Sequence, residues 1–214
     1  MCPIGRGHAL LLAVFLFATP AAQAQRGVQL EVEVPAAPGA GATVTAVNLF
    51  ADDDMRDLVR SGFPAQLHYR LELWRKGGLF DDREHHEEWD VVIQYDPSAQ
   101  RYRVLRRQKE HVDDLGSFAT LTTARVLLER PAKSSIVPDH DKARYYYALA
   151  LDIEALSVSD MDELGRWLRG ARGGTAATAL GTGMRTLMLR LLGGEKRHYE
   201  AKSASFIPAN IVAP

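Results

Sequence analysis

The sequence has one cysteine, Cys2, among its 214 residues, and that cysteine lies in a segment that we expect to be removed. A chain without cysteine forms no disulfide and offers no thiol nucleophile, iron–sulfur cluster ligand or cysteine zinc site. After the first twenty residues the sequence also lacks any apolar run long enough to span a bilayer. We therefore expect a domain that is stabilised mainly by its core, without a transmembrane anchor in the mature chain.

The first 24 residues have the organisation of a cleavable secretory signal. Arg6 supplies the positive charge, and residues 9–18 form an uninterrupted apolar run. Ala22 and Ala24 are the small residues that a signal peptidase requires, so we expect cleavage after Ala24. An uncleaved anchor is the alternative, but the run of about ten residues is half of what a spanning helix needs. The sequence thus predicts an exported protein, periplasmic or extracellular, with a single domain over residues 25–214.

The charge balance of the expected mature chain argues against a nucleic-acid partner. Removal of Arg6 leaves 25 lysines and arginines against 27 aspartates and glutamates. Proteins that bind nucleic acid usually carry a basic excess, which is absent here. The hydrophobic fraction of 46% and the remaining length of about 190 residues are typical of one globular domain with a single core.

The pattern of apolar residues predicts an α+β fold. Strict alternation of apolar and polar residues predicts strands over residues 27–34, 65–74, 89–95 and 144–153, and weaker patterns add strands over 42–50, 102–105 and 199–207. Helical spacing predicts helices over residues 52–61, 118–128, 159–170 and 180–192. Short turns join the middle strands, so we expect an antiparallel β-meander with three or four helices packed on it.

Two clusters of histidine and carboxylate residues are candidate metal sites. The first is the run Glu84-His85-His86-Glu87-Glu88, and the second is Asp139-His140-Asp141. The candidate ligands are His85, His86, Asp139, His140 and Asp141. Adjacent histidines in a strand point to opposite faces, and the first cluster lies between two expected strands. We therefore expect a solvated hairpin connection there, with a metal site as the alternative. The second cluster is also typical of a turn before a strand. Joining the two clusters requires a contact in the fold that the sequence does not show.

No complete catalytic or cofactor motif occurs in the chain. Ser117 follows Gly116 directly, but Leu115 and Ala119 occupy the positions where a nucleophile elbow needs glycine. The Gly181-Thr182-Gly183 run lacks the Lys-Ser/Thr ending of a phosphate loop. We therefore expect no cofactor, and the sequence identifies no catalytic residue.

The predicted helix over residues 180–192 has an apolar stripe bordered by arginines. Its candidate membrane or partner face consists of Met184, Arg185, Leu187, Met188, Arg190 and Leu191. Such a face could lie on a membrane surface or in the groove of a partner protein. Packing against the core of this domain is the alternative, because most domains of this class contain such a helix.

The middle of the chain resembles an uncharacterised exported bacterial family, domain of unknown function 4390. The similarity begins at residues 61–75, where a helix ends at Gly62 and a long alternating strand closes on Trp74 and Arg75. Residues 89–96, 102–104 and 151–156 continue it in the same order, and it covers roughly residues 44–170. The resemblance implies an exported protein but no activity, cofactor or functional residue.

These observations favour a non-catalytic protein of the cell envelope. We expect a binding, scaffold or assembly domain whose partner is an envelope protein or an apolar ligand. One alternative is an exported metal-dependent hydrolase that uses the histidine clusters. Another is a lipid-surface module that uses the helix over residues 180–192.

Overall fold

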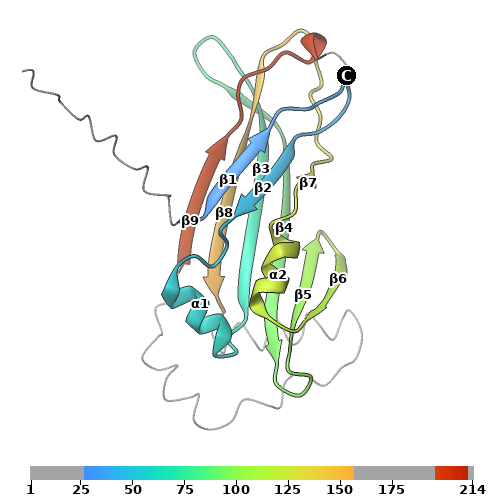
Figure 1. Cartoon of the computed structure of the whole chain (residues 1–214). Coiled ribbons are helices and arrows are strands. Elements are labelled where there is room, and N and C mark those ends of the chain that lie inside the picture. Colours follow the sequence, from blue (N-terminus) through green and yellow to red (C-terminus); the bar gives the residue numbers. More distant parts are fainter. Residues whose placement is uncertain (1–26, 157–195, 212–214) are drawn as a thin grey trace, which may run out of the picture.

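The structure is a computed structural model that describes residues 27–156 and 196–211. The described residues form two antiparallel β-sheets and two α-helices, so the predicted α+β class is confirmed (Figure 1). The helices predicted over residues 159–170 and 180–192 lie outside the described residues.

The larger sheet contains the predicted meander. Its strands, in spatial order, are β6 (His111–Phe118), β5 (Arg101–Gln108), β4 (Asp82–Asp96), β3 (Ala65–Arg75), β8 (Tyr145–Ala155) and β9 (Lys196–Lys202). The strands from β3 to β6 follow one another in sequence and in space, which is the definition of a meander. Strand β3 pairs with β4 on one side and with β8 on the other along its whole length.

A second, smaller sheet covers one face of the larger one. It consists of β1 (Gln29–Glu33), β2 (Thr43–Val47) and the two-residue strand β7 (Ala132–Lys133), in the order β1-β2-β7. Figure 1 shows this sheet lying across β3 and β8, with β1 beside β9. The sequence predicted the first two strands but did not indicate that they form a sheet of their own.

The core lies between the two sheets, on what we call the inner face of the larger sheet. Alternation places one side chain in two on this face. The fully buried inner residues of the two central strands are Ala65, Leu67, Leu71 and Leu73 from β3 and Tyr145, Tyr147, Leu149, Leu151 and Ile153 from β8. These are the residues that the alternation predicted, and Val44 and Ala46 of β2 pack against them from the smaller sheet.

Helix α1 (Asp53–Arg60) has the ends that the sequence predicted. Asp52 caps its N-terminus, where the carboxylate accepts a 3.0 Å hydrogen bond from the Met55 N–H. Gly62 follows its C-terminus with a φ of +95°, a left-handed conformation that glycine adopts without strain. The N–H groups of Gly62 and Phe63 donate back to Val59 and Leu58, which completes a Schellman cap.

Helix α2 (Leu121–Leu128) confirms the helix predicted over residues 118–128 but begins three residues later. Thr120 and Thr123 form a reciprocal capping box that fixes the start. Leu121 and Ala124 bury one side of the helix in the core. Each α-helix has eight residues, and no helix among the described residues is long and apolar enough to cross a membrane.

Strands β4, β6 and β9 depart furthest from the prediction. The run over residues 84–88 is part of β4, so the expectation of a solvated hairpin connection there was wrong: its backbone pairs with β3 although its side chains are polar. Strand β6 was missed, because Asp113, Asp114 and Gly116 interrupt its alternation. Strand β9 begins earlier than predicted. The chain after it stays beside β8 through Ser203 and a bridge from Phe206 to Tyr145, and a short 3-10 helix follows at Pro208–Asn210.

The outer face of the larger sheet carries a buried carboxylate. Asp90 of β4 is 7% exposed and accepts hydrogen bonds from Gln66, His68 and Arg107 at 2.9, 2.8 and 3.0 Å. Burial by itself raises the pKa of Asp90, but the hydrogen bonds from His68, Arg107 and Gln66 outweigh it and hold the pKa below its ordinary value of 3.8. Asp90 thus links three neighbouring strands through its side chain.

We predict that Asp90→Asn lowers the free energy of unfolding by about 2 kcal/mol at neutral pH, because the charged hydrogen bonds to Arg107 and His68 are lost. A depressed pKa stabilises the fold above the ordinary pKa and ceases to do so as the pH falls through the folded-state pKa. The difference in the free energy of unfolding between the variant and the original chain should therefore shrink below pH 3.8. Urea unfolding across this pH range measures it. The control is Asp82→Asn, because its ion pair with Arg75 is exposed to solvent and should contribute little to stability. An equal loss of stability in both variants would contradict the role given to Asp90.

Candidate functional site: an apolar pocket between the sheets

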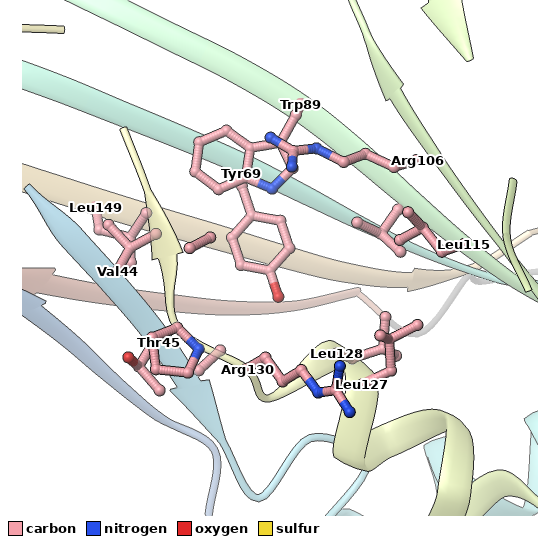
Figure 2. A pocket seen from close by; sticks show the side chains of 14 residues that line it. Val44, Thr45, Tyr69, Trp89, Arg106, Leu115, Leu127, Leu128, Arg130 and Leu149 are labelled. Carbon is pink, nitrogen blue, oxygen red and sulfur yellow. The ribbon is translucent and has the colours of Figure 1, made fainter. Parts of the chain in front are cut away.

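A pocket opens on the inner face where the smaller sheet and α2 do not meet. Its volume is about 200 Å³ (Figure 2). The apolar side chains that line it are Val44, Ala46, Val91, Leu115, Leu127, Leu128, Pro131, Ala132 and Leu149, and the remaining lining residues are Thr45, Tyr69, Trp89, Arg106 and Arg130. A concave, mainly apolar surface with a few polar groups is the usual form of a small-molecule site.

Two stacked aromatic rings line the pocket. Tyr69 of β3 and Trp89 of β4 are direct partners in the sheet register, so their side chains leave the same face at the same height. Their ring centroids lie 5.0 Å apart and their planes differ by 6°. Because both strands are continuously paired, this aromatic surface is held rigidly.

The opposite wall is held by two contacts that are distant in sequence. Val44 of β2 pairs with Ala132 of β7, which ties the chain after α2 to the smaller sheet. Glu129, at the end of α2, accepts a 2.9 Å hydrogen bond from the Leu49 N–H, 80 residues away in sequence. Leu127 and Leu128 are thereby fixed at the edge of the pocket.

The hydroxyl of Tyr69 points into the pocket. The residue is 6% exposed, and within residues 27–156 and 196–211 the structure gives its hydroxyl no hydrogen-bond partner. Figure 2 shows this hydroxyl directed away from the sheet, between the side chains of Arg106 and Arg130 in that view. Burial, together with the nearby Glu129 carboxylate, raises the pKa of Tyr69, so the group is a neutral hydrogen-bond donor at physiological pH. The hydroxyl oxygen is not one of the fully buried unpartnered atoms, so the pocket leaves it open to water or to a ligand.

Two guanidinium groups border the same pocket. Arg106 follows Tyr102 and Val104 on the inner face of β5, and its guanidinium lies 5.6 Å from the Trp89 ring centroid. It makes one side-chain hydrogen bond, to Gln108 at 3.3 Å, and its Nε is buried without a partner. The side chain of Arg130, directly after α2, makes no hydrogen bond or ion pair in the part of the chain that the structure describes.

The pocket combines an apolar interior with positively charged guanidinium groups that remain available to a ligand. The Glu129 carboxylate acts on Tyr69 through its charge, but it already accepts a hydrogen bond from the Leu49 N–H and lies 3.5 Å from Nε of Arg125. The donors left for a ligand are therefore the Tyr69 hydroxyl and the guanidinium groups of Arg106 and Arg130. Such a set would accommodate an apolar group that carries an anion.

No complete sequence motif marks Tyr69, Arg106 and Arg130 as residues of one site. One signal was present: Arg106 continues the apolar alternation of Tyr102 and Val104, so it places a charge on a core-facing position. Nothing in the sequence marks Arg130, because its position depends on how α2 lies over the larger sheet.

The structure separates most of the predicted metal-site residues. His85 lies on the inner face of β4, where its Nε2 is 2.8 Å from an oxygen of Asp139, whereas His86 is exposed on the outer face opposite Glu72. His140 and Asp141 are exposed and do not join this contact. The two clusters therefore do meet in the fold, through one contact between His85 of the first and Asp139 of the second.

The predicted membrane or partner face of Met184, Arg185, Leu187, Met188, Arg190 and Leu191 lies outside the described residues. The structure therefore neither supports nor contradicts that prediction.

Comparison with known proteins identifies the family but no activity. No curated protein and no solved structure matches the chain. A sequence model of the family described as domain of unknown function (DUF4390) matches residues 40–183, which extends the resemblance noted in the sequence at both ends. Because this match covers more than half of the sequence, the chain belongs to the DUF4390 family.

Proposed function

We propose that this chain is an exported binding domain that holds a small amphipathic ligand, an apolar group bearing a carboxylate, in the pocket between its two sheets. The observation that carries the proposal is the Tyr69 hydroxyl, which reaches the pocket without a partner among the described residues, together with the buried and unpartnered Nε of Arg106 on the same pocket. The secretory pattern of the first 24 residues supports export. The absence of a catalytic motif in the sequence favours binding over turnover.

The volume of the pocket limits the apolar part of the ligand. A cavity of about 150 Å³ holds a molecule the size of benzene. The pocket of about 200 Å³ therefore suits a phenyl group or a short acyl chain. The apolar contact with Leu127, Leu128 and the Trp89 ring would supply most of the affinity, because removal of apolar surface from water is favourable.

The polar groups suggest that the ligand has a negative charge. Arginine binds carboxylates through two parallel hydrogen bonds, and these are stronger than neutral ones. The Tyr69 hydroxyl can add a donor from the aromatic surface of the pocket. A neutral ligand would leave both guanidinium groups without an anionic partner, whereas a cation would be repelled by them.

We predict that octanoate binds the purified mature chain more tightly than octan-1-ol, which has the same chain length without the charge. Replacing Arg106 or Arg130 by Gln should weaken octanoate binding about tenfold, the equivalent of one charge-assisted hydrogen bond, and leave octanol binding nearly unchanged. Isothermal titration calorimetry measures the affinity for both ligands.

The control is Arg103→Gln, because Arg103 pairs with Asp114 on the outer face of β5. Equal weakening by all three variants, or equal affinity for both ligands, would contradict the proposed charge selectivity.

A second prediction tests the location of the site. Leu128→Trp should fill the pocket and abolish binding of octanoate and octanol alike, because the larger ring occupies the apolar volume. The matched control is Val126→Trp on the same helix, whose side chain is 56% exposed and does not line the pocket. The same titration, with circular dichroism to confirm folding, measures the effect. Retained binding in a folded Leu128→Trp variant would place the ligand elsewhere.

A further inference from the structure

A second group of polar side chains converges at the far end of β4 from the pocket. It consists of Glu84, His85 and Asp139, and one ligand atom of each lies within 4.8 Å of the other two. His85 lies four residues before Trp89, a separation of about 13 Å along a strand. The group is thus distinct from the pocket. It joins two distant parts of the chain, because Asp139 is 54 residues from His85 in sequence.

A β-bulge explains how two consecutive residues reach the same side of the sheet. Leu73 pairs with His85 and Trp74 pairs with Arg83, so Glu84 is an extra residue without a partner on β3. In regular pairing Glu84 and His85 would point to opposite faces. At the bulge, Glu84 instead turns to the inner face, where it accepts a 3.1 Å hydrogen bond from the Tyr145 hydroxyl.

Asp139 is held in place by the loop that carries it. Glu87 of β4 accepts hydrogen bonds from the Ser134 hydroxyl and the Ser135 N–H at 2.9 and 3.1 Å. On the other side, the carbonyl of Asp141 accepts a 2.8 Å hydrogen bond from the Ala209 N–H. The loop is therefore tethered on both sides of Asp139, so its carboxylate is presented to His85 by fixed backbone.

The two oxygens of Glu84 have different surroundings. Oε1 faces the Tyr145 hydroxyl and lies 3.4 Å from Nε of Arg75. Oε2 has only a long contact of 3.5 Å with the Asp139 N–H. Hydrogen bonds to the rear oxygen of a carboxylate are the usual support of a metal ligand, and Oε2 remains available on the side of His85 and Asp139.

We propose that Glu84, His85 and Asp139 form a binding site for a divalent zinc-class cation. One imidazole nitrogen and two carboxylate oxygens are a donor set that zinc accepts, and water could complete a tetrahedral shell. Tetrahedral ligands at zinc lie about 3.3 Å apart. The His85 and Asp139 ligand atoms, now 2.8 Å apart, would move slightly apart on zinc binding. Ligand atoms up to 4.8 Å apart would move closer by about 1.5 Å, which rotation of the side chains can provide.

Another histidine in the structure provides a useful contrast. His198 lies 2.7 Å from Asp152 through Nδ1 and 3.0 Å from Glu200 through Nε2. Its carboxylates contact opposite ring nitrogens, so they cannot converge on one ion together with the ring. His198 therefore has the same residue types as the proposed site without its geometry.

The test is zinc binding by the purified, metal-free mature chain. Equilibrium dialysis with elemental analysis should show one zinc ion per chain, and differential scanning calorimetry should show a melting temperature that rises with zinc concentration. His85→Ala and Asp139→Asn should each weaken binding at least tenfold and remove most of the thermal shift. His86→Ala and Asp141→Asn, which change the neighbouring residues of the same types, should retain both.

Three results would overturn the proposal. The first is that the original chain binds no zinc. The second is that His86→Ala and His85→Ala lose zinc binding equally. The third is that His198→Ala loses zinc binding while His85→Ala retains it. The outcome does not depend on the pocket, because octanoate binding can be measured separately in the same variants and should be unchanged in His85→Ala.

Discussion

The pairing of β3 with both of its neighbours is the constraint on which the rest of the molecule depends. Strand β3 pairs along its whole length with β8 and, apart from the bulge at Glu84, in one register with β4. A shift of one residue in either register would turn every inner side chain of the shifted strand to the outer face. The stacked rings of Tyr69 and Trp89 exist only in the observed register, so the aromatic surface of the pocket follows directly from it.

The pocket itself results from incomplete coverage of a broad sheet. Six strands present one apolar face, but the smaller sheet has only three strands, of which β7 has two residues. Helix α2 covers another part of that face through Leu121 and Ala124. The area between these coverings lies above Tyr69 and Trp89, and Arg106 and Arg130 border it instead of further apolar residues.

The alternation of the sequence was sufficient to predict the strands of the core and the meander. It succeeded for β3 and β8 because both are central strands with one buried face, which gives a clear period of two. It failed for the beginning of β4, because Glu84, His85 and Glu87 lie beyond the apolar core yet keep the backbone pairing of the strand. It also failed for β6, an edge strand whose Asp113 and Asp114 are exposed.

The candidate sites were harder to predict from the sequence than the fold was. The pocket depends on the distance between α2 and the smaller sheet, which no local pattern encodes. The contact between His85 and Asp139 depends on a bulge and on a loop tethered to Glu87. Of the five candidate metal ligands, only His85 and Asp139 meet, and Glu84 of the first cluster completes the group.

The hydrogen bond between Leu49 and Glu129 has a consequence for the order in which the chain can assemble. It joins residues that are 80 positions apart, whereas β4, β5 and β6 are connected by short turns. Bringing distant segments together requires a larger loss of chain entropy than closing a hairpin. The third strand of the smaller sheet therefore has little stability until the meander between these two residues has formed. Since that strand and α2 provide one wall of the pocket, we expect the cavity to form after the local contacts of the meander.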